Sequence, residues 1–120
     1  MAKKPQHPAP KPAKKVTACF YANAAGKEPV RDWLLSLSDA DRKVIGADIA
    51  TVEFGWPVGM PTCRALGDGL YEVRSTITSS RIARVIFAFD GSDIVLLHGF
   101  IKKTQATPKA DIDLAKSRKG

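Results

Sequence analysis

The pattern of hydrophobic and polar positions in the first half of the chain predicts one strand followed by two helices. Residues 16–21 form the first apolar run, which a turn signal rich in Asn, Ala and Gly ends. Pro29 suits the first turn of a helix in which apolar residues recur on one face. Ser38 or Asp39 caps a second helix, and Gly55 stops it. We expect the two helices to form an antiparallel hairpin.

The second half of the chain predicts an antiparallel meander of three strands. Three short apolar runs carry it, and they include residues 70–74, 81–87 and 93–103. A short closing helix follows over residues 111–119, started by Pro108. The order of strand, helical hairpin, meander and helix is typical of a small α+β fold.

Length and charge indicate one domain with a separate N-terminal tail. The chain has 120 residues and a formal charge of +7, which is enough length for one modest core. Residues 1–15 are rich in Lys and Pro and carry five of the lysines, so residues 16–120 keep only 14 basic against 12 acidic residues, or +2. We expect the tail to be disordered, either as an electrostatic tether to nucleic acid or as a solubilising extension. A polyanion site in the domain must therefore come from local placement of charge.

The cysteines and the hydropathy of the chain exclude several classes of protein. Cys19 and Cys63 are isolated and belong to no metal-binding motif. No segment approaches the roughly 18 apolar residues that a membrane helix needs. We expect a reduced, cytoplasmic protein with no disulfide, no structural metal and no cofactor.

Strand parity brings basic residues together on one face of the meander. Glu72 and Arg74 alternate with the apolar positions of their strand and are expected on a wet face. If residues 78–80 form a three-residue loop, Arg74 lies directly opposite Arg84 on the next strand. Facing guanidinium groups repel, so Glu72 or an anionic ligand is expected between them. The alternative is a structural cluster of arginines and Glu72 that covers the sheet.

The register of the last strand decides which lysine joins this face. A three-residue loop over residues 90–92 aligns His98 and Lys102 with the two arginines, whereas a shorter or longer loop brings Lys103 there. His98 lies inside an apolar run, where a lone histidine is either a hydrogen-bonded core residue or an acid-base group. Both the lysine and the role of His98 stay open at this stage.

The C-terminal segments together resemble a known family. The run from Leu97 to Pro108 reads Leu-His-Gly-Phe-x-Lys-Lys-Thr-x-x-Thr-Pro and precedes a helix. With residues 70–74 and 81–87, it resembles the phage-derived RelE/HigB-like toxins of type II toxin–antitoxin modules, over residues 16–118. The resemblance implies a ribosome-dependent messenger RNA endonuclease that inhibits translation. It also implies an antitoxin partner, usually one with a helix-turn-helix domain, besides ribosome and messenger RNA.

The resemblance implies cleavage by the ribose 2′-hydroxyl without a metal, so the protein must move protons and stabilise phosphorane charge. Arg74 and Arg84 would clamp the scissile phosphate. Lys102 or Lys103 would orient RNA or protonate the leaving oxygen, and His98 is the remaining acid-base candidate. The further residues expected to bind RNA are Arg64, Arg81, Lys103 and Lys109, with Glu72 in support.

The same pattern offers candidates for base stacking and for antitoxin contact. Tyr71 and Phe100 are the candidates for stacking on a base, because residues 111–120 contain no aromatic. An apolar patch around Trp33, Leu34 and Leu37 would suit an antitoxin, although Trp33 and Trp56 are expected in the core. A chain with no true general base would depend on the ribosome to align the RNA.

Two functions of other classes remain as alternatives. The first is a non-catalytic prophage regulator of the same fold that binds an antitoxin-like partner or nucleic acid. The second is a direct DNA-binding module, suggested by the basic tail, although residues 16–120 show no helix-turn-helix pattern or basic helix.

Overall fold

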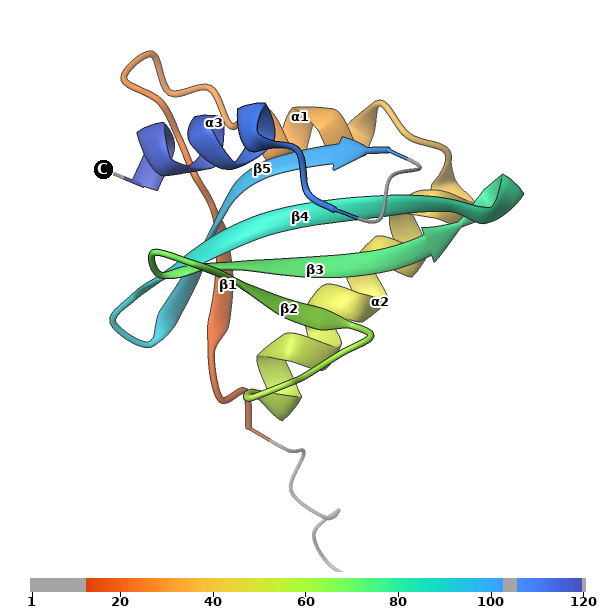
Figure 1. The fold of residues 1–120 in the computed structure, drawn as a ribbon, viewed down its shortest axis with the longest axis horizontal. Helices are drawn as coiled ribbons and strands as arrows, with labels where there is room; N and C mark the ends of the chain where they lie inside the picture. The colour runs from red at the N-terminus through yellow and green to blue at the C-terminus, as the bar shows by residue number, and fades with distance from the viewer. Residues whose placement is uncertain (1–12, 103–105, 120) are drawn as a thin grey trace, which may run out of the picture.

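The computed structural model describes residues 13–102 and 106–119, which form a small α+β fold (Figure 1). The helices and strands lie in the predicted order, with one additional strand. Their bounds are β1 Thr17–Phe20, α1 Pro29–Leu35, α2 Asp39–Gly55, β2 Cys63–Gly67, β3 Leu70–Ile77, β4 Arg81–Asp90, β5 Asp93–Ile101 and α3 Lys109–Lys119. A single 3-10 turn, Thr78–Ser80, joins β3 to β4.

The strands of the described residues form one mixed sheet of five, in the order β1-β5-β4-β3-β2. The predicted meander is its antiparallel part, β3-β4-β5. β1 pairs with β5 in parallel, because the helical hairpin between β1 and the meander carries the chain across the sheet. The fold class predicted from the sequence is confirmed.

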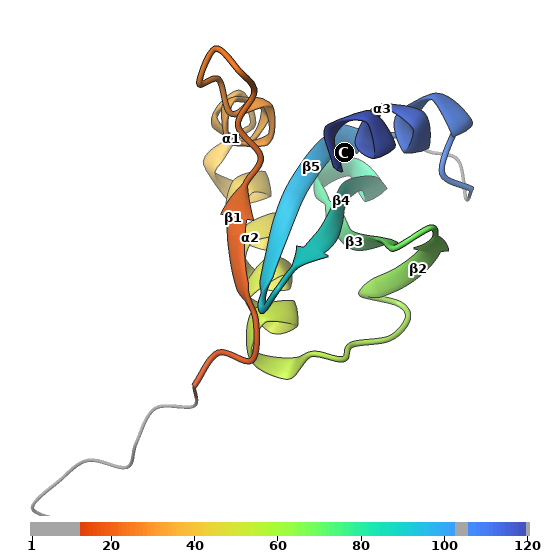
Figure 2. The same ribbon diagram turned by 90° about the vertical axis from the view of Figure 1, so that its left-hand side faces the viewer.

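The helical hairpin of α1 and α2 covers one face of the sheet (Figure 2). The hydroxyl of Ser38 accepts a hydrogen bond of 3.2 Å from the backbone N–H of Asp41, so Ser38 is the cap of α2. Ile45, Ile49 and Val52 of α2 pack on the inward residues of the central strands. Trp56 follows α2 and lies edge-on to the rings of Tyr71, Phe87 and Phe89. The expectation that Trp56 belongs to the core is confirmed.

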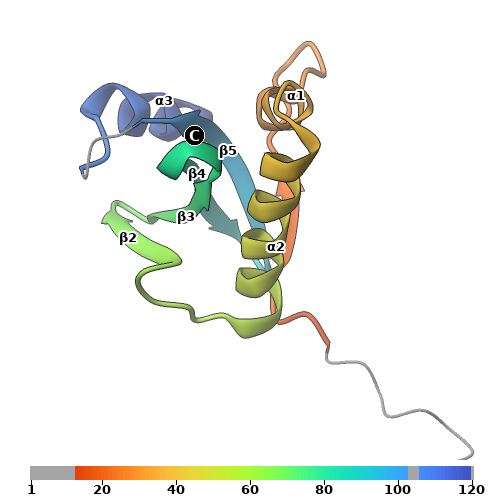
Figure 3. The same ribbon diagram turned by 90° about the vertical axis from the view of Figure 1, so that its right-hand side faces the viewer.

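Helix α3 covers part of the opposite face, so the sheet lies between α3 and the hairpin (Figures 2 and 3). Ala115 of α3 and Phe100 are buried there, together with Leu70, Ile86 and Leu97. The prediction of a single wet face carrying Glu72 is therefore wrong for the middle of the sheet. The closing helix has its own apolar positions, and it buries this surface instead of leaving it to solvent.

The sequence pattern predicts no strand at the position of β2. Arg64 lies opposite Glu72 in the observed antiparallel pairing, and the register shifts between Ala65 and Gly67. The strand is short, contains only one large apolar residue and ends at a glycine with φ +90°. A short edge strand with a bulge gives little alternation to detect.

Lys14 and Lys15, which the sequence assigned to the tail, contact the folded domain. The Lys14 ammonium lies 3.1 Å from a carboxylate oxygen of Glu53, and the backbone N–H of Lys15 donates to the Glu53 carbonyl. Residues 1–12 of the predicted tail lie outside the described residues. No helix among the described residues is long and apolar enough to span a membrane.

Gly99 lies directly beneath the ring of Trp33, which packs across β5 from α1. A Cβ atom at this position would overlap the six-membered ring of the indole. The close approach therefore requires a residue without a side chain, and it explains the glycine within an otherwise apolar strand.

We expect Gly99→Ala to lower the free energy of unfolding by about 1–3 kcal/mol, because the added methyl group forces the indole or β5 to move. Gly46→Ala is the matched control, since Gly46 lies in α2 with nothing within 4 Å of an added Cβ. The control is expected to stabilise by up to about 1 kcal/mol through helix propensity. Urea unfolding of the three proteins measures both effects, and equal stability of Gly99→Ala and wild type would refute the close packing.

Candidate functional site

Arg74 and Arg84 lie directly opposite each other on β3 and β4, as the sequence predicts. The three residues from Thr78 to Ser80 form the connection, with Ser79 and Ser80 at positive φ. This loop length also pairs Ile77 with Arg81. The prediction of the β3–β4 register is confirmed.

His98 and Lys102 share the face of Arg84, although the loop that was predicted to place them there is wrong. Asp90 pairs with Asp93, so the turn contains two residues and not three. The register then shifts by one residue, because Phe87 pairs with Leu96 whereas Ile86 pairs with His98. This β-bulge restores the parity that a three-residue loop would have given. Lys103, the other candidate lysine, lies outside the described residues.

Arg84 and Glu72 are fully buried in the middle of this face, each 0% exposed. The hydroxyl of Thr107, in the segment before α3, donates a hydrogen bond to one carboxylate oxygen of Glu72. The other oxygen lies 3.8 Å from Nε of Arg74. Burial lowers the pKa of Arg84, and the negative charge of Glu72 opposes that effect. Glu72 therefore offsets part of the positive charge of Arg74 and Arg84, and its support of an RNA site stays a prediction.

Arg74 and Arg64 are positively charged side chains that lie closer to solvent than the buried Arg84 and Glu72. Arg74 is half-buried with its side chain 13% exposed, and Arg64 is exposed on β2 opposite Glu72. Both positive charges contribute to the lowered pKa of Arg84, so the three guanidinium groups are near neighbours. We call Arg64, Arg74, Arg84 and Lys102 the basic cluster.

Asp111 of α3 links two members of the predicted site. One of its carboxylate oxygens lies 2.7 Å from Nε2 of His98, and the other lies 3.1 Å from the ammonium of Lys102. The imidazole also stacks on the ring of Phe100, with centroids 5.2 Å apart. Burial alone raises the pKa of Asp111, but the hydrogen bonds from His98 and Lys102 outweigh it and hold the pKa below its ordinary value.

The sequence did not single out Asp111. The available signal is its place three residues after Pro108, in the first turn of α3, where an acidic residue is common for helix-dipole reasons alone. Only the docking of α3 on β5 shows that this carboxylate faces His98 and Lys102.

Asp111→Asn is expected to lower the free energy of unfolding by about 1–3 kcal/mol at pH 7, because hydrogen bonds to a charged group are lost. A depressed carboxyl pKa stabilises the fold above the unfolded pKa of about 3.9 and loses this contribution as the pH falls through the folded value. The difference between the two proteins should therefore shrink below about pH 4.

Urea unfolding between pH 7 and pH 3 measures this effect of Asp111. Asp113→Asn is the control, since Asp113 forms an exposed ion pair with Lys109 and is expected to change stability by less than about 1 kcal/mol. A difference between Asp111→Asn and wild type that stays constant over this pH range would contradict the assignment.

Two residues predicted to bind RNA have other contacts. Arg81 donates to the Asp41 carboxylate at 2.9 Å and to Thr78, which ties α2 to the β3–β4 turn. Lys109 pairs with Asp113 on the outer side of α3, at 2.6 Å. The structure does not bring either residue into contact with the basic cluster.

The two candidates for base stacking are buried or engaged in packing. Tyr71 stacks on Phe87 with ring centroids 5.6 Å apart, inside the aromatic group around Trp56. Phe100 is buried beneath α3. Trp33 packs on Gly99, and Leu34 and Leu37 of the predicted antitoxin patch are half-buried against the core. Leu35, which the prediction did not include, is exposed.

The described residues contain no group of three or more His, Cys, Asp or Glu that could hold a metal ion. Both cysteines of the described chain are free thiols. Burial raises the pKa of the Cys63 thiol to about 11. A buried thiol with a raised pKa is a poor nucleophile at neutral pH, so Cys63 is a packing residue.

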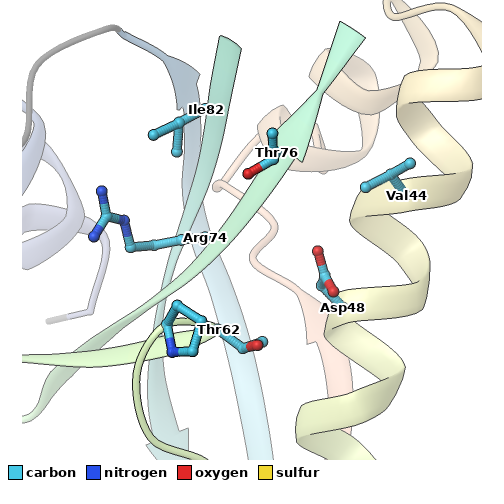
Figure 4. A pocket seen from close by; sticks show the side chains of 7 residues that line it. Val44, Asp48, Thr62, Arg74, Thr76 and Ile82 are labelled. Atoms are coloured by element: carbon cyan, nitrogen blue, oxygen red, sulfur yellow. The ribbon is translucent and has the colours of Figure 1, made fainter. Parts of the chain in front are cut away.

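A cavity of about 420 Å³ lies beside the basic cluster, between β3 and α2 (Figure 4). Arg74 belongs to its lining and to the basic cluster, so the two regions are continuous. The residues that line the cavity are Val44, Asp48, Pro61, Thr62, Arg74, Thr76 and Ile82.

The chain matches a known protein family. The family described as phage derived protein Gp49-like (DUF891) matches residues 32–120, which begin within α1 and include α2, the strands from β2 to β5 and α3. No curated protein matches the chain. All residues of the basic cluster, and Asp111, lie within the matched segment.

Proposed function

Because the chain belongs to the Gp49-like family of phage-derived proteins, a toxin-like family, we propose that it is the toxin of a type II toxin–antitoxin module. Its activity would be ribosome-dependent cleavage of messenger RNA, which inhibits translation. The observation that carries the proposal is the basic cluster on one face of the sheet, next to the His98–Asp111–Lys102 contacts. The RelE/HigB-like character of that activity rests on the resemblance of the C-terminal segments.

The basic cluster suits cleavage by the ribose 2′-hydroxyl. In that reaction the hydroxyl oxygen attacks the adjacent phosphorus, negative charge builds on the phosphate oxygens, and the 5′-oxygen leaves with a proton. Arg74 reaches solvent and offers forked donors to the phosphate. Arg84 is buried beneath it, so we assign Arg84 a positive potential under the phosphate instead of direct contact.

His98 and Lys102 are the groups placed to move protons. Both already bond to Asp111, and neither side chain is fully exposed. A general base must lie within hydrogen-bond reach of the attacking hydroxyl, so the RNA has to be held in one orientation beside Asp111. This requirement favours a reaction in which the ribosome, and not the protein alone, aligns the substrate.

An antitoxin encoded beside the toxin is the expected partner. The exposed side chain of Leu35 on α1 and the region around Trp33 provide apolar surface for it. In this proposal the antitoxin, and not the toxin, carries the DNA-binding domain.

A non-catalytic regulator of the same fold is the second candidate function. It is favoured by the complete burial of Glu72 and Arg84 and by the contacts of Asp111, which are also what a structural cluster would show. The two functions differ in whether RNA is cut.

Primer extension on a defined messenger RNA in a purified translation system tests the proposed function. We expect new 5′ ends within the translated region when protein and ribosomes are both present, and none on the naked RNA. Absence of cuts under both conditions would favour the non-catalytic regulator, and efficient cutting of naked RNA would contradict ribosome dependence.

A further inference from the structure

The cavity between β3 and α2 exists because β2 pairs with only part of β3. Cys63, the first residue of β2, pairs with Val73, and the backbone N–H of Arg74 donates to the Thr62 carbonyl at 2.8 Å. Beyond this bond β3 continues to Ile77 with α2 as its neighbour on that side. The volume of about 420 Å³ lies in the range of small-molecule sites.

The lining of the cavity includes one carboxylate and two hydroxyl groups. Asp48 is a half-buried carboxylate on α2, and in Figure 4 it lies across the opening from β3 and Thr62. The hydroxyl groups of Thr62 and Thr76 are donors on the β side. Val44 and Ile82 give apolar walls. The cavity therefore offers one strong acceptor opposite two hydroxyl donors.

Guanine is the nucleobase whose edge complements this set. Its N1–H and N2 amino groups are adjacent donors that a carboxylate accepts together, and its O6 accepts from a hydroxyl. Adenine places a ring-nitrogen acceptor beside its single amino group, which would face the carboxylate unfavourably. Each pyrimidine likewise lacks two adjacent donors on that edge.

Arg74 connects the cavity to the proposed cleavage site. In Figure 4 its guanidinium group extends from β3 toward the α3 side, away from Asp48, while its residue still lines the cavity. We propose that the cavity binds an unstacked guanine of single-stranded RNA, with Asp48 reading the base while Arg74 contacts the backbone. This inference rests on the proposed function, and it gives the enzyme a base preference near the cut.

An extended polypeptide paired along β3 is the other occupant that this place suggests. Beyond Val73, strand parity turns the backbone groups of Arg74 and Thr76 toward the open edge of β3, and the N–H of Arg74 is already bonded to Thr62. Two residues offer only a very short ladder for strand addition. A base is a better match for the half-buried carboxylate of Asp48.

Binding of short RNA analogues tests the proposal independently of cleavage. The probes are two uncleavable 2′-O-methyl trinucleotides, AGA and AAA, titrated into the full-length protein and followed by NMR. We expect AGA to bind at least tenfold more tightly than AAA, with shifts at Asp48, Thr62 and Thr76. Asp48→Asn should remove this preference, whereas Arg74→Ala should weaken both probes alike.

The same NMR titration is repeated with a control variant, and several of its possible results would overturn the proposal. Asp32→Asn, an exposed carboxylate on α1, is expected to bind as wild type does. Equal affinity for AGA and AAA, binding of neither, or a guanine preference that survives in Asp48→Asn would overturn the proposal. So would shifts at Thr76 produced by the antitoxin protein and not by AGA. Guanine preference without RNA cleavage would keep this inference and refute the proposed function.

Discussion

Arg74→Ala is expected to slow cleavage of ribosome-bound messenger RNA by about 100- to 1000-fold. Arg74 is the arginine of the opposed pair that reaches solvent, and removing one donor that stabilises transition-state charge typically has an effect of this size. Its side chain is not part of the apolar core, so the variant should fold. Single-turnover cleavage on programmed ribosomes measures the rate.

Two further variants show whether Arg74 acts through its positive charge or through the geometry of its hydrogen-bond donors, and whether loss of any arginine slows cleavage. Arg74→Lys should recover part of the rate, because a lysine keeps the positive charge but loses the forked geometry. Arg31→Ala changes an exposed arginine on α1 and should cleave as wild type does. A wild-type rate in Arg74→Ala would remove Arg74 from the mechanism.

Glu72→Ala is expected to have the largest effect on stability, lowering the free energy of unfolding by about 3–5 kcal/mol. Glu72 is fully buried, and its negative charge opposes the lowering of the Arg84 pKa by burial. Its removal leaves the buried positive charge of Arg84 beside Arg74 and takes away the acceptor of Thr107. Urea unfolding monitored by circular dichroism measures the change.

A double variant shows whether charge or volume is responsible. Replacing Glu72 by Leu and Arg84 by Met together should be much less destabilising than Glu72→Ala, because both buried charges are removed at once. Equal destabilisation by the two variants would mean that Glu72 acts through packing alone.

The sequence was sufficient to predict the alignment at the centre of the site. A hairpin loop of fixed length sets the register of its strands, so Thr78–Ser80 alone places Arg74 opposite Arg84. The order of helices and strands followed in the same way from local periodicity and from Ser38 as a cap. A loop length and a helix cap each depend on residues that are close together in the sequence, so both can be predicted from it.

The β-bulge at Leu97 and the contacts of α3 could not be predicted in this way. The bulge has no turn residue to mark it, and it reverses the parity that the two-residue turn between Asp90 and Asp93 sets. The burial of Glu72 and Arg84 depends on where α3 docks, and this is a tertiary contact. The partnership of Asp111 with His98 and Lys102 joins residues on separate elements.

The short strand β2 had a further consequence for the site. Because the sequence predicts no strand there, Arg64 was expected to bind RNA but had no place in the sheet. Its position opposite Glu72 brings it onto the face of Arg74 and Arg84. Because β2 begins opposite Val73, the rest of β3 is left without a strand on that side, where Asp48 lines the cavity.

We propose that this chain cuts messenger RNA on the ribosome through the 2′-hydroxyl of the RNA. The most direct measurement compares two messengers on programmed ribosomes, identical except for a 2′-deoxynucleotide on the 5′ side of one mapped cut. We expect the all-ribose messenger to be cut there and the substituted one not to be cut, while other sites are cut in both. Cleavage at the substituted position, or no cleavage of either messenger, would contradict it.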